Sequence, residues 1–172
     1  MLTAHGIVRR GRMLPNKMIL LYVPMIYRQD EGLWPPSNPS SWYFKWQKQL
    51  WNLFLSVGAC KPGRLKVIWK AGPRTSNLSD PIKTYKDSTG TIHYSERSLQ
   101  GELKRCDIVL VDFLSTPMME AIMVDKTVWC VTPAWDRPFI SNDVDLSRVY
   151  FFENIDQGIN IIRGRIHESI PK

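Results

Sequence analysis

The sequence predicts an α/β domain of the three-layer, Rossmann-like type, in which an open, mostly parallel sheet of about six strands carries helices on both faces. Three observations lead to this fold class. Six short apolar runs alternate along the chain with amphipathic or polar segments. Several of these runs are nearly continuous rather than alternating, which is typical of parallel strands that are buried on both faces. The chain has 172 residues, which is the size of one such domain.

Composition and charge narrow the class of protein further. Hydrophobic residues make up 44% of the chain and charged residues 23%, which indicates a globular domain. The net charge of +7 favours an anionic partner, although scattered basic residues also fit an ordinary solvated surface. Cys60, Cys106 and Cys130 are far apart, so we expect no disulfide framework and no metal site. Cys106 and Cys130 are predicted to be small buried hydrophobic residues in a reducing compartment.

Residues 1–16 are predicted to be a basic arm or linker, and residues 17–172 a single Rossmann-like domain. The first strand is expected over Met18–Val23. Arginines precede the longer apolar run 18–27, as they do in a signal peptide, but this run contains Pro24, leads into charged residues and lacks a cleavage site. It is also too short to span a bilayer. We therefore expect a core strand and a cytoplasmic protein.

The middle of the chain alternates helices and strands. A helix over residues 42–57 follows from apolar side chains spaced three and four apart, and Gly58 is expected to end it. The next strand is Leu65–Trp69. The further elements expected before residue 107 are a short helix over 80–85, a strand over 91–94 and a helix from Ser98 to Arg105.

Residues 107–134 are predicted to form a β-α-β unit around which the rest of the domain is organised. The unit consists of a strand over 107–112, a helix over 117–125 and a strand over 127–131. A loop at 135–139, a strand over 148–152 and a last helix capped by Asn154 or Asp156 complete the chain.

Polar side chains cluster where the predicted strands end. In open parallel sheets, ligands bind at the carboxyl ends of the strands. The residues at these ends, in chain order, are Arg28, Lys70, Arg74, Ser95, Glu96, Asp112, Ser115, Thr116, Thr132, Asp136 and Arg137. The glycine-rich dinucleotide motif, the Walker A loop and the hydrolase motif G-x-S-x-G are absent from the sequence, so this collar of polar residues is the candidate site.

The strongest part of the collar lies at the start of the helix predicted from Pro117. Ser115 and Thr116 precede that proline, and their hydroxyls together with the first backbone N–H groups suit a phosphate, or they simply cap the helix. Glu120, expected in the first turn, can accept hydrogen bonds from ribose hydroxyls or can interact with the helix dipole. Lys70 and Arg74 can neutralise a pyrophosphate or can be ordinary surface charges.

At these residues the chain resembles the nucleotide-binding, C-terminal lobe of GT-B-fold glycosyltransferases. The resemblance is to surface-carbohydrate and capsule transferases, and more distantly to CDP-glycerol glycerophosphotransferases. It covers residues 65–133 and rests on the segment from Cys106 to Asp112, on Ser115-Thr116, on Glu120-Ala121 and on the turn Asp125-Lys126 before a strand. The strand that ends in Lys70-Ala-Gly-Pro is similar to the family's strand ending in Lys-x-His-Pro, but Gly72 stands in place of the histidine.

The resemblance implies a role for each matching residue. Glu120 would bind the ribose of a nucleotide-activated sugar, Ser115 and Thr116 would hold its phosphates, and Lys70 would supply positive charge to the leaving group. Asp112, Arg74 and Arg28 complete the expected nucleotide-sugar site. The implied function is donor binding for surface polysaccharide synthesis, with no metal and no cofactor. Complete enzymes of this fold have two lobes, so a second lobe or a partner subunit would supply the catalytic base.

Two other classes of function remain open from the residues alone. One is a non-catalytic α/β interaction module whose basic face binds an anionic polymer or a protein. The other is a small complete transferase of the nucleoside or phosphoribosyl type. The sequence gives no sign of a specific nucleic-acid partner, and the resemblance allows a peripheral association with the inner face of the membrane.

Overall fold

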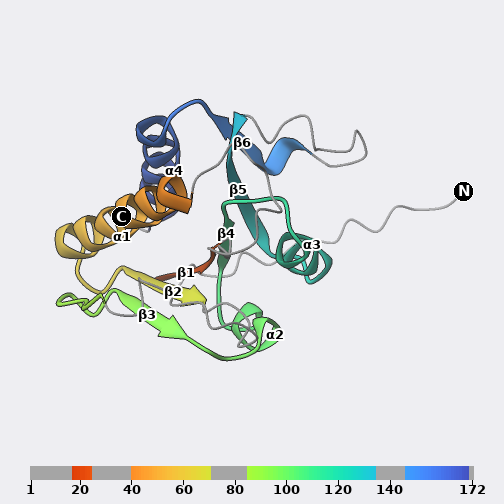
Figure 1. The fold of residues 1–172 in the computed structure, drawn as a ribbon. Coiled ribbons are helices and arrows are strands. Elements are labelled where there is room, and N and C mark those ends of the chain that lie inside the picture. The colour runs from red at the N-terminus through yellow and green to blue at the C-terminus, as the bar shows by residue number, and fades with distance from the viewer. Residues whose placement is uncertain (1–16, 25–39, 71–84, 135–145, 171–172) are drawn as a thin grey trace, which may run out of the picture.

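The computed structural model describes residues 17–24, 40–70, 85–134 and 146–170, which form one six-stranded sheet with helices on both sides (Figure 1). Every pair of neighbouring strands is parallel. The strands are β1 (Met18–Val23), β2 (Leu65–Lys70), β3 (Ile92–Ser95), β4 (Ile108–Val111), β5 (Thr127–Pro133) and β6 (Val149–Phe152). The helices are α1 (Ser40–Cys60), α2 (Leu99–Leu103), α3 (Thr116–Met123) and α4 (Ile155–Ser169), and a 3-10 turn spans Leu146–Arg148.

The strand order is β3-β2-β1-β4-β5-β6, which is the order of dinucleotide-binding Rossmann sheets. The two central strands, β1 and β4, are neighbours in the sheet although they are far apart in the sequence. The strand order reverses between them. Ligands of open α/β sheets bind outside the carboxyl ends of the strands at such a point, so the fold places a candidate crevice beyond β1 and β4.

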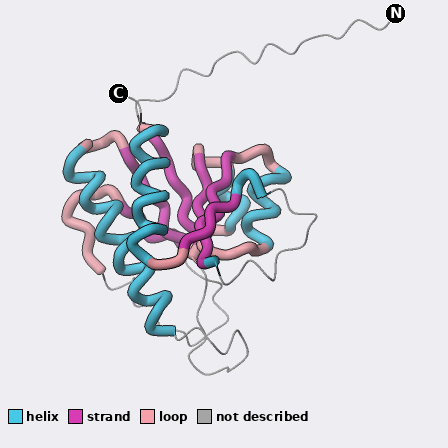
Figure 2. Tube along the Cα trace, turned by 90° about the horizontal axis from the view of Figure 1, so that it is seen from above, coloured by secondary structure: helices cyan, strands magenta, loops and turns pink. Residues whose placement is uncertain are grey.

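The helices form two layers, one on each face of the sheet (Figure 2). Side chains of α1 and α4 pack against one face of the sheet. The core that they form there contains Trp46, Phe54 and Ile162, which are all fully or almost fully buried. Side chains of α2 and α3 pack on the other face in a second core with Val109 and Cys130. The expected three-layer architecture is therefore confirmed, and the apolar stripe of the first helix packs against the sheet as its spacing predicts.

The predicted strands and most helices agree with the structure to within one or two residues. Two helix starts are confirmed in detail: Ser98 accepts a hydrogen bond from the Gly101 N–H at 3.2 Å, and Asn154 accepts one from the Gln157 N–H at 3.0 Å. The arm at 1–16 and the loop at 135–139 lie outside the described residues, as does the helix expected over 80–85, apart from Tyr85. In the described part of the chain, no helix has both the length and the apolar character needed to cross a membrane.

The expectation that Gly58 ends the first helix is wrong, because α1 continues to Cys60. The structure gives a different reason for a glycine at this position. A Cβ atom added to Gly58 would lie 1.9 Å from Thr91 Oγ1, which is far inside van der Waals contact. Thr91 is buried and its Oγ1 is hydrogen-bonded to the Thr89 hydroxyl at 2.8 Å, so it has little freedom to move away. Gly58 therefore allows α1 to approach the segment that leads into β3.

We expect the substitution Gly58→Ala to lower the free energy of unfolding by about 1–2 kcal/mol, because overpacking against Thr91 outweighs the better helix propensity of alanine. Gly164→Ala in α4 is the matched control, since no atom lies within 4 Å of a Cβ added there. That control should raise stability by about 0.5–1 kcal/mol. Urea denaturation followed by circular dichroism measures both, and equal effects of the two substitutions would contradict the close approach.

The cysteines divide into one exposed and two buried residues. Cys106 and Cys130 are buried, as predicted, and Cys60 is exposed at the end of α1. Burial raises the pKa of the Cys106 thiol from 9.0 to about 11, although the nearby Lys126 ammonium acts in the opposite direction. Since the thiolate is the reactive form, Cys106 is protected by both inaccessibility and its protonation state.

We expect only one of the three thiols, that of Cys60, to react quickly with an aromatic disulfide reagent in the native protein at pH 8. Cys106 and Cys130 should react only when the protein unfolds. Absorbance counts the thiols released before and after addition of denaturant. Rapid modification of Cys106 in the native protein, located by mass spectrometry, would contradict the buried environment.

Candidate functional site

The carboxyl end of β4 carries a buried acid. Asp112 follows β4 directly and is 1% exposed, and its carboxyl group accepts a hydrogen bond from the Tyr22 hydroxyl of β1. Tyr22 belongs to the core that lies under α1 and α4. A buried carboxyl group is costly unless it is hydrogen-bonded, and Tyr22 provides that bond across the two central strands. Asp112 therefore ties β1 to β4 at the edge where the strand order reverses.

The turn after Asp112 leads into α3, and the start of this helix lies at the same edge of the sheet. Ser115 is the N-cap residue, and its carbonyl oxygen accepts hydrogen bonds from the N–H groups of Met118 at 3.0 Å and Met119 at 3.3 Å. Its hydroxyl makes no capping bond to the helix. Thr116 is exposed. The Ser115 side chain therefore does not cap the helix, which was one of the two roles that the sequence left open for it.

Glu120 lies in the second turn of α3, so the expectation that it lies in the first turn is wrong. The helix starts at Thr116, one residue earlier than predicted, and has no acidic residue in its first turn. Glu120 is half-buried on the side of α3 that faces α2. A carboxylate that interacts with the helix dipole would lie in the first turn, so the Glu120 carboxylate is one turn too far from the helix N-terminus for that role. It borders a cavity.

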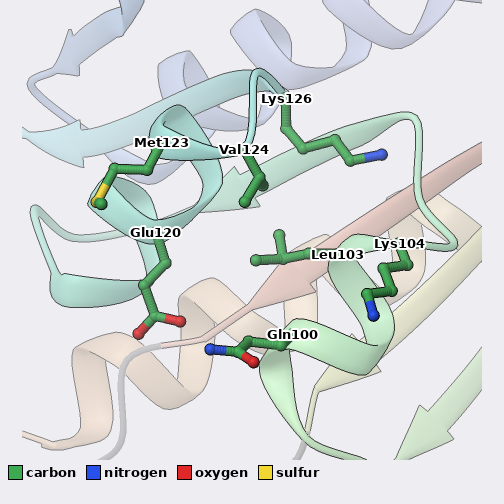
Figure 3. A pocket seen from close by; sticks show the side chains of 7 residues that line it. All are labelled: Gln100, Leu103, Lys104, Glu120, Met123, Val124 and Lys126. Atoms are coloured by element: carbon green, nitrogen blue, oxygen red, sulfur yellow. The ribbon is translucent and has the colours of Figure 1, made fainter.

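This cavity, which we call the α2–α3 groove, has a volume of about 630 Å³ and lies between the two helices (Figure 3). At one end, the side chains of Glu120 and Gln100 point toward one another. At the other end, Val124 faces Leu103. Such a volume is in the range of small-molecule sites. The residues that line it are Gln100, Leu103, Lys104, Glu120, Met123, Val124 and Lys126.

Helical spacing explains how the groove forms. Gln100 and Lys104 are four residues apart, as are Glu120 and Val124, so each pair lies on one side of its own helix. Lys126 fixes the end of the groove, because its Nζ donates a hydrogen bond to the Cys106 carbonyl oxygen at 2.7 Å. Leu103 of α2 and Ala121 of α3 belong to the same core as the β4 residues Val109 and Val111. The groove consequently combines an apolar floor with charged and amide groups at its rim.

A second polar cluster lies at the carboxyl ends of β2 and β3. Glu102 of α2 is completely buried; its Oε1 accepts a hydrogen bond from the Ser95 hydroxyl at 2.6 Å, and its Oε2 lies 3.3 Å from Arg105 Nη1. Lys70, at the end of β2, is the register partner of Ser95. Burial lowers the pKa of Lys70, while the carboxylates of Glu102 and Glu96 act in the opposite direction. Lys70 therefore lies in an environment where protein carboxylates partly balance its charge.

We expect Glu102→Ala to lower the free energy of unfolding by about 2 kcal/mol, because it leaves the buried Ser95 hydroxyl without its acceptor and opens a cavity. Glu168→Ala is the control. It removes the same kind of i,i+3 pair with an arginine, Arg165, but Glu168 is 67% exposed. Its cost should stay below about 0.5 kcal/mol. Denaturant titrations compare the two variants, and equal costs would show that the burial of Glu102 is energetically unimportant.

The structure brings the predicted site residues together only in part. Four of them lie at the carboxyl edge of the sheet: Lys70, Asp112, Ser115 and Thr116. Lys70 is at the end of β2, the other three follow β4, and β1 lies between these two strands. Glu120 lines the α2–α3 groove, and the other four do not. Arg28 and Arg74 lie outside the described residues, as do Gly72, Asp136 and Arg137.

The residues of α2 were not among the site residues predicted from the sequence. Gln100 and Lys104 line the groove and Glu102 is buried, but this helix has only five residues and shows no clear apolar stripe from which their orientation could be read. Tyr22 was missed because it lies within an apolar run. A tyrosine in such a run indicates a buried hydrogen bond, since a buried tyrosine hydroxyl usually has a hydrogen-bond partner. In the described segments, no group of three or more His, Cys, Asp or Glu side chains is arranged to hold a metal ion.

The fold and the strand order place the chain in the class of α/β proteins with a Rossmann-type parallel sheet. Comparisons with models of protein families, with curated proteins and with solved structures each found no match to the chain.

Proposed function

We propose that the chain is the donor-binding lobe of a glycosyltransferase-like protein and binds a nucleotide-activated sugar. The fold is compatible with this function, because the strand order reverses between β1 and β4, and ligands of open parallel sheets bind beyond the carboxyl ends of the strands at such a point. The resemblance of residues 65–133 to the nucleotide-binding lobe of GT-B-fold enzymes supplies the class of ligand. Its acceptor site and catalytic base would come from a second lobe or a partner subunit.

One observation carries the proposal: Glu120 borders the α2–α3 groove on the same helix whose N-terminus carries Ser115 and Thr116. Glu120 is four positions after Thr116, which corresponds to about 6 Å along a helix. This separation suits a ligand that presents a phosphate to the helix N-terminus and ribose hydroxyls to the carboxylate. A carboxylate is an acceptor only, so it pairs with hydroxyl donors and repels phosphate.

The chemistry of the proposed site is electrostatic. The helix N-terminus and the hydroxyls of Ser115 and Thr116 stabilise the negative charge of a phosphate. Lys70 adds a positive charge at the same edge of the sheet. When the bond to the sugar breaks, negative charge builds up on the departing nucleotide, and preorganised donors of this kind lower the barrier. Asp112, buried against Tyr22, keeps the turn before α3 in place rather than contacting the ligand.

We expect Glu120→Ala to weaken the binding of a nucleoside mono- or diphosphate at least tenfold, or about 1.4 kcal/mol. Isothermal titration calorimetry with CMP, CDP, UDP and GDP measures the effect, and Glu168→Ala on the exposed face of α4 serves as the control. Glu120→Gln should recover part of the affinity, because an amide oxygen still accepts a hydrogen bond.

Two results would contradict the proposal. One is the absence of binding by any of these nucleotides at millimolar concentration. The other is unchanged affinity in the Glu120→Ala variant. Binding of an anionic polymer that falls steeply with salt and does not depend on Glu120 would instead favour an interaction module with a basic face.

A further inference from the structure

The side chains along one side of α3 change in chemistry from the start of the helix to its end. Thr116, Glu120 and Val124 follow one another at intervals of four residues, so each lies about 6 Å further along the helix. They provide a hydroxyl at the helix N-terminus, then a carboxylate, then an apolar side chain. A nucleotide presents its groups in the matching order, which is phosphate, ribose and base. The α2–α3 groove continues beyond Glu120 to Lys126, so a ribose at Glu120 would fill only its first part.

We propose that the α2–α3 groove binds the nucleobase of the donor beyond Glu120, and that Lys104 and Lys126 select uracil over cytosine. The proposal rests on the proposed function, because it requires the phosphate of the ligand to lie at the start of α3 and its ribose to lie at Glu120. The identity of the base and the two residues that recognise it are additional to that function.

The groove beyond Glu120 has an apolar floor that suits the flat face of a base. Leu103 of α2 and Val124 of α3 face one another there (Figure 3). Leu103 is buried, whereas the Val124 side chain is 54% exposed and is accessible to an occupant of the groove. Small-molecule sites combine such apolar surfaces with a few polar groups that fix the orientation of the ligand. In this part of the groove, those polar groups are Lys104 and Lys126.

Lys126 is held in place through both its backbone and its side chain. The helix α3 ends in a Schellman motif, in which Asp125 has a φ of 56° and its N–H donates to the Ile122 carbonyl oxygen at 3.0 Å. The Lys126 N–H donates to the Ala121 carbonyl oxygen, also at 3.0 Å. At the other end of the residue, the Lys126 Nζ donates to the Cys106 carbonyl oxygen at 2.7 Å. An ammonium group has three N–H donors, so this lysine is positioned in advance and can still donate to a ligand.

The hydrogen-bond donors at this end of the groove distinguish uracil from cytosine. The two bases have the same size but differ at position 4, where uracil has a carbonyl oxygen that accepts and cytosine has an amino group that donates. Lysine ammonium groups only donate. Two backbone carbonyl groups beside them already accept a hydrogen bond, that of Cys106 from Lys126 and that of Leu103 from the Cys106 thiol at 3.6 Å. The uracil oxygen would accept from the lysines, whereas the cytosine amino group would face other donors.

Gln100 lies at the opposite end of the groove and does not take part in this selection. Its side chain points toward Glu120 (Figure 3). An amide both donates and accepts hydrogen bonds, so Gln100 can contact the ribose beside the Glu120 carboxylate. Recognition of the base is therefore left to the two lysines.

Isothermal titration calorimetry with UMP, CMP and ribose 5-phosphate tests the proposal. The unaltered protein should bind UMP about tenfold or more tightly than either CMP or ribose 5-phosphate, because only UMP offers the base and its acceptor. Lys104→Met and Lys126→Met should each lower the ratio of UMP to CMP affinity about threefold or more, and should change the affinity for ribose 5-phosphate much less. Lys104 is exposed, so its variant tests the selection without disturbing the contacts that hold Lys126.

Lys48→Met is the matched control, because it removes one positive charge from the exposed side of α1. It should leave the ratio of UMP to CMP affinity unchanged. Circular dichroism verifies that all three variants fold.

The outcomes separate this proposal from the proposed function. Equal affinity for UMP and CMP, or a preference for UMP that both lysine variants retain, would overturn the selection by Lys104 and Lys126. The proposed function would still stand if Glu120→Ala weakened the binding of both nucleotides. Equal affinity for UMP and ribose 5-phosphate would overturn the placement of the base in the groove. Failure of both nucleotides to bind at millimolar concentration would overturn the proposed function, and the base site with it.

Discussion

The pairing of β1 with β4 at the centre of the sheet is the constraint on which the rest of the structure depends. Two aspartates secure it, one at each end of β4. Asp107 accepts a hydrogen bond from the Ile19 N–H at 2.8 Å, and Asp112 accepts one from the Tyr22 hydroxyl. The strands between these bonds are buried on both faces, so an unpaired polar group there would be costly. The two bonds thus favour one register over a shifted alternative.

This central pairing also determines where the helices lie. The helix α1 covers one face of the sheet and α3 covers the other, so the connections that leave β1 and β4 diverge. The helix α2 precedes β4 and α3 follows it, and both lie on the same face of the sheet, where the α2–α3 groove forms between them. Among the described residues, the fully buried side chains of the core on this side, such as Leu103, Met118 and Ala121, include no aromatic ring.

The two ends of α3 offer different chemistry. Its start combines hydroxyls, the helix dipole and the crevice beyond β1 and β4, and these features favour an anion. Its end exposes the apolar side chains of Met123 and Val124. Glu120 lies between the two ends. Glu102 and Ser95, which are buried, and Arg105, which is exposed, interact with one another and support α2, the other wall of the groove.

The sequence by itself determined the class of fold, because apolar runs and helical spacing are local patterns, and all the strands and the longer helices here follow them. Ser98 and Asn154 cap their helices, and Cys106 and Cys130 are buried, as the residues around them predicted. Only the tertiary structure decided the strand order, the reason for Gly58 and the partners of Asp112 and Glu102. These depend on contacts between segments that are distant in the sequence, such as Gly58 with Thr91, and no local spacing encodes which distant side chain fills a given space. For the same reason the sequence could select Glu120 as a candidate but could not place it in the α2–α3 groove, since that groove exists only where two separate helices meet.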